Sequence, residues 1–143
     1  MDLKKPLLPS THHYRQFLGK ENKFIIGDDE ISYNNNLLKF GKKWHYANKE
    51  IIYKSNSLCY RTEELDYFKN KDFALILGSS DVYGIGLAED EIWHHQIKNK
   101  LGLEILNAGF NASGPDIQML NSMLISSIPC YGDVLLIISQ SMA

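Results

Sequence analysis

The stretch Phe73-Ala-Leu-Ile-Leu-Gly-Ser-Ser-Asp-Val-Tyr-Gly-Ile-Gly-Leu87 decides the fold of this 143-residue chain. Its first five residues are all apolar, as in strands of parallel sheets that are buried on both faces. Gly78 ends the run, and Ser79, Ser80 and Asp81 follow at once. Ligands of open parallel sheets bind just beyond the carboxyl ends of the strands, so these three side chains lie where a site is expected. The alternative is an ordinary strand-to-helix loop rich in turn-forming residues.

Further apolar segments continue the pattern after this turn. The sequence predicts strands over 104–107 and 134–138 and helices over 89–101 and 115–128. Alternation of strands and helices with short loops predicts a parallel, right-handed α/β unit. His94 and His95 are expected at the surface or boundary of the first helix. The residues expected to face the sheet are Ile92, Trp93, Ile97 and Leu101 in the first helix, and Ile117, Leu120, Leu124 and Ile128 in the second, with Met119 and Met123 beside them as core.

The chain before this unit divides into two segments. Residues 1–43 are weakly patterned, with a short strand expected at Phe24–Ile26 and loop expected over 34–36 and 41–43. Residues 44–72 form an extended lead-in segment, with a strand over 50–53, followed by a charged connector that is expected to be solvated. Residues 73–143 hold the α/β unit.

Composition limits the possible functions. Apolar residues make up 44% and charged residues 22%, which is typical of a globular protein, and the formal net charge of −2 implies no nucleic-acid partner. No apolar run approaches the ~20 residues of a membrane span, and there is no signal-peptide pattern, so a cytoplasmic location is expected. Cys59 and Cys130 have no metal-ligand spacing. The adjacent His12 and His13 lack a third spaced ligand, so no metal and no cofactor are expected.

A serine on a sharp turn before a helix is a candidate nucleophile, with nearby backbone N–H groups as an oxyanion hole. Such a serine also needs a base, normally a histidine oriented by a carboxylate. The five histidines, at positions 12, 13, 45, 94 and 95, all precede the later strands that would carry one to this edge. The residues alone therefore predict an incomplete serine site.

Three motifs resemble those of the SGNH (GDSL) hydrolases. The segment Ile76-Leu-Gly-Ser-Ser-Asp-Val-Tyr-Gly-Ile-Gly-Leu87 is similar to the first block, which carries the nucleophile. Asn107-Ala-Gly-Phe-Asn-Ala-Ser-Gly114 resembles the second block, whose glycine donates a backbone N–H to the oxyanion hole. Asn56-Ser-Leu-Cys-Tyr-Arg61 is similar to an Asn-Ser-Leu-Gly-Tyr-Arg segment that often precedes such domains, with Cys59 in place of glycine.

The resemblance implies a fold and a site. It implies a three-layer α/β/α fold with a parallel flavodoxin-like sheet, of which residues 73–143 are the front half. Ser80 matches the nucleophile, and Ser79 replaces the usual aspartate. Ala112 stands in the place of the oxyanion glycine and supplies its backbone N–H, and Gly109 belongs to the same oxyanion loop. The implied activity is serine ester hydrolysis on carbohydrate, lipid or small acyl esters.

The chain also departs from the family. The third block, Gly-x-Asn-Asp, is expected near Ser139, where the chain reads Ser-Gln-Ser-Met-Ala, and the closing Asp-x-x-His would lie beyond Ala143. The sheet is therefore expected to be incomplete at its C-terminal end and the chain inactive alone, with self-association through the exposed edge of the 134–138 strand. Two alternatives remain: a non-catalytic SGNH-like interaction module, and a nicotinamide-binding Rossmann-like module built on Gly78, Gly84 and Gly86.

Overall fold

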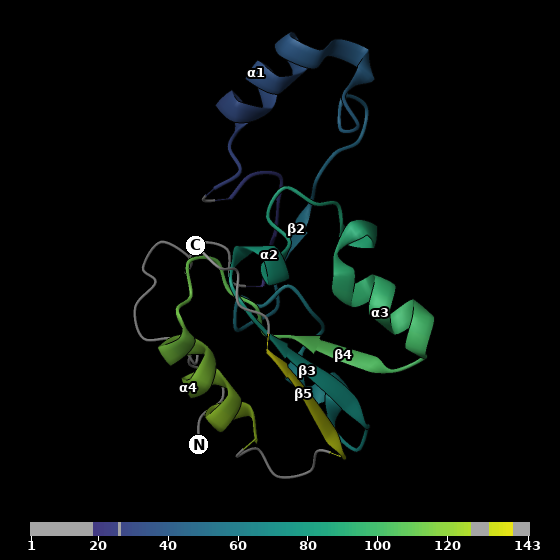
Figure 1. The fold of residues 1–143 in the computed structure, drawn as a ribbon, viewed down its shortest axis with the longest axis vertical. Helices are drawn as coiled ribbons and strands as arrows, with labels where there is room; N and C mark the ends of the chain where they lie inside the picture. The colour runs from purple at the N-terminus through teal and green to yellow at the C-terminus, as the bar shows by residue number, and fades with distance from the viewer. Residues whose placement is uncertain (1–18, 26, 127–131, 139–143) are drawn as a thin grey trace.

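The computed structural model describes residues 19–25, 27–126 and 132–138, which form a mixed α/β arrangement (Figure 1). Three parallel strands, β3 (Phe73–Leu77), β4 (Glu104–Asn107) and β5 (Val134–Ile138), lie in the order β4-β3-β5. Phe73 aligns with Glu104 on one side and with Val134 on the other. The prediction of three parallel strands is confirmed. The described sheet is nevertheless smaller than the extended flavodoxin-like sheet that the resemblance implies.

The central strand β3 is buried at all five positions, as its unbroken apolar run predicts. Its side chains alternate between two apolar clusters. Ala74 and Ile76 join one cluster, against which Trp93 and Ile97 of helix α3 (Trp93–Leu101) pack. The other cluster receives the remaining β3 side chains, the segment before β3, and Ile117 and Ile125 of helix α4 (Pro115–Ser126).

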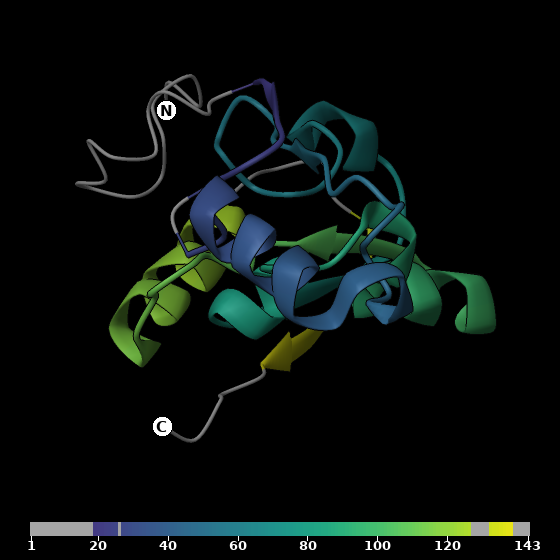
Figure 2. The same cartoon turned by 90° about the horizontal axis from the view of Figure 1, so that it is seen from above.

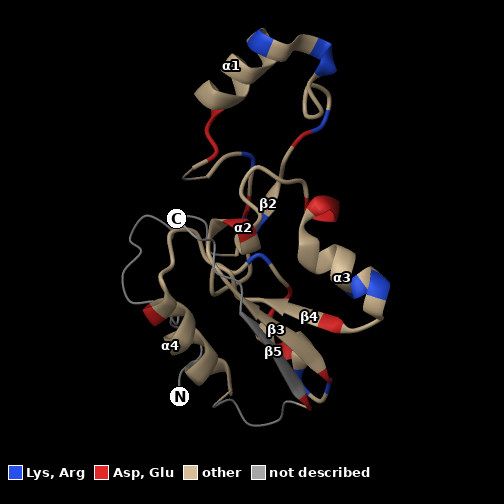
Figure 3. Cartoon of the chain, in the orientation of Figure 1, with Lys and Arg blue, Asp and Glu red and all other residues tan. Residues whose placement is uncertain are grey.

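Helix α3 begins four residues later than predicted. The acidic residues Glu89–Glu91 form a separate 3₁₀ turn, Ile92 is extended, and α3 then runs from Trp93 to the left-handed Gly102. Acidic residues before the helix and basic residues in its last turn suit the helix dipole (Figure 3). Two expectations for its faces are wrong, because Leu101 is 67% exposed and His94 is only 4% exposed.

Helix α4 confirms only part of its predicted apolar stripe. Ile117 packs against the core as expected, but Leu120, Met119 and Met123 are exposed. Among the described side chains of the helix, those that are buried are Gln118, Asn121 and Ile125, whose i, i+3, i+7 spacing is helical but lies one residue away from the predicted stripe. The methionines are therefore not core residues here. Position 128 lies outside the described residues.

A loop was expected within residues 30–43, but helix α1 (Glu30–Phe40) and a 3₁₀ turn (Gly41–Lys43) occupy it. The Asp29 side chain accepts from the Ser32 N–H at 2.8 Å, and left-handed Gly41 closes the helix. These caps outweigh the weak helix propensity of three consecutive asparagines. The helix has no buried residue and stands away from the sheet (Figure 1), so in the view from above it lies in front of the other elements (Figure 2).

The segment between α1 and β3 is less extended than predicted. Only Tyr53–Lys54 form a strand, β2, which pairs antiparallel with β1 (Glu21–Asn22). The expected strand at 24–26 is reduced to a single bridge between Ile25 and Asp28, and residue 26 is not described. The charged connector contains a 3₁₀ turn with buried Leu65 and Phe68, so it is solvated only in part. No helix among the described residues is long and apolar enough to cross a membrane.

Candidate functional site

The turn after β3 presents Ser79 and Ser80 half-buried and Asp81 exposed. Ser79 is the N-cap of α2 (Ser80–Tyr83), and Ser80 is therefore the first residue of this one-turn helix. Left-handed Gly84 ends the helix and donates its N–H to the Ser80 carbonyl at 3.0 Å. The structure thus places Ser80 on a sharp turn at the carboxyl end of the central strand.

The loop after β4 is bound to the same turn. The Phe110 N–H and the Ser113 hydroxyl both donate to the carbonyl oxygen of Gly78, at 3.0 and 2.9 Å. This carbonyl belongs to the residue that ends β3, so the two small-residue loops meet as their sequence positions predict. The structure brings Ser80 and the Ala112 loop to one edge of the sheet.

Gly109 allows this loop to lie directly on α2. A Cβ atom at position 109 would come within 2.5 Å of Val82 Cγ1 and 2.8 Å of the Tyr83 backbone nitrogen, so only glycine fits. The Gly109 N–H donates to the Asn107 side-chain oxygen at 2.9 Å. Gly109 is therefore a close-packing residue of the loop after β4, and its own N–H is already bonded.

Ser80 and Ala112 retain the backbone donors that an oxyanion hole requires. Within the described part of the chain, neither the Ser80 N–H nor the Ala112 N–H donates a hydrogen bond. Ala112 is exposed and adopts a left-handed conformation with φ of 59°. That region favours glycine, because a Cβ atom there crowds the following carbonyl.

The Asn56–Arg61 segment folds as a compact turn, and its last residue, Arg61, is bonded to Gly84 at the end of α2. The Asn56 side-chain oxygen accepts from the N–H groups of Leu58 and Tyr60 at 3.0 and 2.9 Å. This geometry places Cys59 in the left-handed region, with φ of 69°. Burial raises the pKa of its thiol to about 11, so Cys59 is a thiol at neutral pH.

Arg61 anchors the chain that follows Ser80. Its side chain is fully buried and donates to the carbonyl oxygens of Gly84 and Leu87 at 2.6 and 2.9 Å. It also pairs with Glu89 at 3.1 Å and stacks on Tyr53. Burial works to raise the pKa of Glu89, but hydrogen bonding to His95 and the Arg61 charge outweigh it, so this pKa is lowered. In the sequence Arg61 is only one residue of a motif. Its burial and its hydrogen bonds show that it anchors the turn after α2.

The described histidines are all engaged away from Ser80. His45 Nε2 bonds Glu91 at 2.5 Å, His94 Nδ1 accepts from Asn107 at 2.9 Å, and His95 Nε2 bonds Glu89 at 2.8 Å. His12 and His13 lie outside the described residues. None of these histidine bonds, in the described part of the chain, reaches Ser80.

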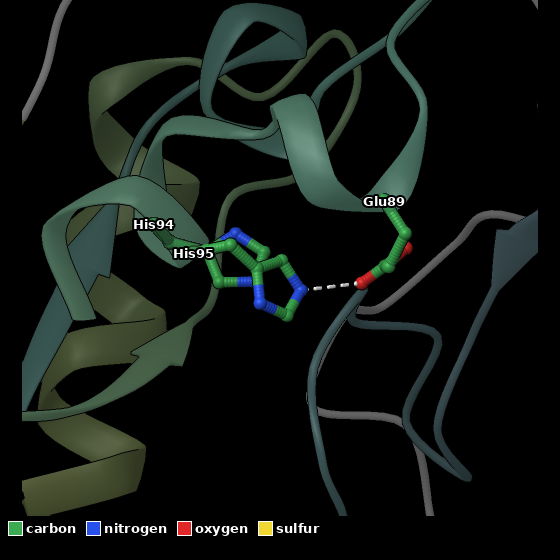
Figure 4. Close-up of side chains that lie close together, drawn as sticks. All are labelled: Glu89, His94 and His95. Atoms are coloured by element: carbon green, nitrogen blue, oxygen red, sulfur yellow. Dashed lines mark hydrogen bonds and ion pairs between the residues drawn. The ribbon is translucent and has the colours of Figure 1, made fainter. Parts of the chain in front are cut away.

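Glu89, His94 and His95 form the one cluster of metal-ligating residues found in the described ranges, with ligand atoms within 4.8 Å of one another (Figure 4). The two imidazole rings lie 4.2 Å apart, and His95 faces the Glu89 carboxylate. His94 Nδ1 accepts a hydrogen bond from the Asn107 amide, so the neutral ring carries its proton on Nε2. In a histidine that binds a metal, one ring nitrogen binds the ion through its lone pair and the other donates its N–H to a protein acceptor. His94 shows the reverse, because its Nδ1 accepts a hydrogen bond from the protein and its Nε2 carries the proton. Lys54 and Lys98 line the same 140 Å³ pocket, so the cluster fits a hydrogen-bond network better than a metal centre.

Comparison with known proteins identifies no relative. No protein-family model matches the chain, and no curated protein and no solved structure matches it. A functional assignment therefore depends on the three short motifs and on the geometry of the site.

Proposed function

We propose that this chain carries the nucleophile and oxyanion loop of an SGNH-type serine ester hydrolase, with Ser80 as the nucleophile. One observation carries the proposal. Cys59 and Ala112 are the two positions at which the chain has another residue where the SGNH-like motifs have glycine, and both have positive φ. The one other non-glycine residue with positive φ among the described residues is Asn70, and asparagine tolerates the left-handed conformation. Backbone conformation thus supports the alignment of two motifs, independently of residue identity.

The site offers most parts of an acyl transfer. Ser80 Oγ would attack the ester carbonyl and form a tetrahedral oxyanion. Collapse of the oxyanion would break the bond to the leaving alcohol, which takes up the proton removed from Ser80, and leave an acyl-serine. The N–H groups of Ser80 and Ala112 would donate to the oxyanion. The hydroxyl proton must pass to a base from outside the described residues. Without that base the serine is weakly nucleophilic, so we expect the chain alone to be a poor catalyst.

The fold is consistent with this proposal. Helices α3 and α4 pack on opposite clusters of the sheet, as in the three-layer α/β/α fold implied by the SGNH resemblance. The substrate class that follows is an ester of a carbohydrate, a lipid or a small acyl group. The nicotinamide alternative has less support, because the helix that directly follows Gly78 has only four residues and offers a weak dipole to a pyrophosphate.

A non-catalytic interaction module is the second candidate. It is favoured by the engagement of the described histidines away from Ser80 and by the exposed Met119 and Met123 on α4. Such a module would use the α/β unit for binding and leave Ser80 without chemical function.

The two candidates separate in an acylation experiment with an added base. The chain is incubated with p-nitrophenyl acetate in the presence of 2-methylimidazole, whose methyl group hinders its own attack on the ester. We expect the base to accept the Ser80 proton, and an acetyl group to appear on the Ser80 peptide by mass spectrometry. The Ser80→Ala variant should lose this label and Ser79→Ala should keep it. Acetylation of Ser79 would contradict the assignment of Ser80, and acetylation of lysines alone would favour the interaction module.

A further inference from the structure

Asn107 occupies the point at which three elements meet. It is the last residue of β4, is fully buried, and aligns with Ile76 of the central strand. Its Nδ2 donates to the Val82 carbonyl of α2 at 2.8 Å and to His94 Nδ1 of α3 at 2.9 Å. Its Oδ1 accepts from the Gly109 N–H at 2.9 Å. Both amide hydrogens and the carbonyl oxygen are therefore used.

These bonds determine the orientation of the amide and the tautomer of His94. Rotating the amide by half a turn would set its oxygen against the Val82 carbonyl and its hydrogens against the Gly109 N–H, with repulsion at both contacts. In the observed orientation His94 Nδ1 must be an unprotonated acceptor, because Asn107 presents only hydrogens to it. A protonated His94 would oppose N–H to N–H. Burial lowers the pKa of His94 to about 3, in agreement with a neutral ring.

The same bonds join the two parts of the Ser80 site. Val82 is two residues from Ser80 on α2, and Gly109 opens the loop that carries Ala112. The absence of space for a Cβ atom at Gly109 shows that the loop already lies in contact with α2. A shift of the Asn107 side chain would therefore change the spacing between the serine and the oxyanion donor.

We propose that His94 and Asn107 are positioning residues of the Ser80 site: the neutral imidazole holds the Asn107 amide, and the amide holds α2 against the loop of Ala112. This role deepens the proposed function and rests on it as far as Ser80 chemistry is concerned. The bonds themselves are buried, so removing the acceptor at His94 leaves an amide hydrogen without a partner. A residue that only fills space at position 94 would not require an acceptor there.

The first test is the tautomer of His94 in the full chain. In ¹⁵N-labelled protein at pH 7, we expect the His94 ring to show an unprotonated Nδ1 and a protonated Nε2, with scalar or NOE contact to the Asn107 amide. His45, whose ring is exposed, serves as the internal reference. A protonated Nδ1 on His94 would overturn the proposal, because Asn107 could then not hold the ring.

The second test uses two variants that differ in the presence of an acceptor. His94→Gln keeps a carbonyl oxygen that can accept from Asn107, and His94→Leu does not. We expect His94→Leu to speed amide exchange at Gly109 and Phe110 by about tenfold relative to global unfolding, and to slow base-assisted acetylation of Ser80 by a similar factor. His94→Gln should recover most of both. The matched control is His45→Gln, which should leave both rates unchanged.

The outcomes separate this role from the proposed function. If the parent chain acetylates Ser80 and both position-94 variants match it, the positioning role is wrong and the function stands. If the parent chain takes no acetyl group on Ser80, the function is wrong, and the tautomer and the Gly109 exchange rate decide whether the pair joins α2 to the loop. Equal loss in His94→Gln and His94→Leu would mean that the ring only fills space, which would also overturn the proposal.

Discussion

Arg61 Nη1 donates to the carbonyl oxygen of Gly84 at 2.6 Å, and this bond holds the end of helix α2 against the turn that begins at Asn56. The two residues are 23 positions apart in the chain. All three nitrogens of this fully buried guanidinium donate, in four hydrogen bonds to three carbonyl oxygens and one carboxylate, so its loss strands several polar groups at once.

We therefore expect Arg61→Met to lower the free energy of unfolding by about 3–5 kcal/mol, because it leaves buried carbonyl oxygens without a donor and leaves Glu89 with His95 as its remaining partner. Urea unfolding followed by circular dichroism measures the change. The control is Lys54→Met, which removes an exposed ion pair with Glu21 and should shift stability by about 0.5 kcal/mol or less. An Arg61→Met variant as stable as the control would show that the buried network contributes little.

Ala112→Gly should stabilise the chain. Ala112 is exposed at φ of 59°, so glycine relieves the left-handed strain without removing a buried contact. We expect a gain of about 1 kcal/mol after the greater flexibility of glycine in the unfolded chain is counted. Ala47→Gly, at a position without positive φ, should instead destabilise.

Residue 59 provides a second test of the same strain. Cys59→Gly and Cys59→Ala both lose the buried thiol, and they differ only in the Cβ atom at φ of 69°. We expect the glycine variant to be more stable than the alanine variant by about 1 kcal/mol in thermal unfolding. Equal stability would mean that the turn does not require a left-handed residue, which would weaken the motif alignment.

Gly109→Ala should push the loop after β4 away from α2. The added methyl group would meet Val82 Cγ1 at 2.5 Å and backbone at 2.8 Å, so we expect a loss of about 1–3 kcal/mol in the free energy of unfolding. Gly114→Ala is the matched control, because its methyl group would meet chiefly the Asp116 side chain, which can rotate away. Similar stability of the two variants would show that the loop is not in close contact with α2.

The Glu91 carboxylate binds three residues of the segment that follows α1 and its 3₁₀ turn. We therefore expect the attachment of that segment to the α/β unit to depend on pH. Burial works to raise the pKa of Glu91, but hydrogen bonds from Tyr46, His45 and Lys49 lower it from 4.5 to about 2. Because the folded pKa is depressed, the stabilisation is present above pH 4.5 and is lost as pH falls towards 2. We expect Trp44 fluorescence, in a Trp93→Phe background, to change over that interval before the sheet unfolds.

Glu91→Gln should reproduce this change at neutral pH, since a neutral amide is a weaker acceptor for Lys49 and His45. Hydrogen exchange over residues 30–49 should increase, with the strands unaffected. The control Asp90→Asn alters a carboxylate that is 76% exposed and should have little effect. Unchanged exchange in Glu91→Gln would show that aromatic packing around Trp44 holds this region by itself.

The sequence by itself determined the central strand and its neighbours. An unbroken apolar run at 73–77 is typical of a strand that lies between two others in a parallel sheet, and glycine followed by two serines ends it at a turn. The meeting of the loops at Ser80 and Ala112 follows from parallel strand order alone. Signals of this kind depend on residues close together in the chain, so the strand and the turn could be predicted from the sequence.

Only the tertiary structure decided which helical face is buried and which polar groups lie inside. In α4 several faces have similar apolar content, so contacts with the sheet selected Asn121 and Ile125 over Met123. His94 and Asn107 are 13 residues apart, and no pattern in the sequence predicts the hydrogen bond between them. Their pairing depends on how α3 lies across β4, because a buried amide must find its partners wherever packing places them.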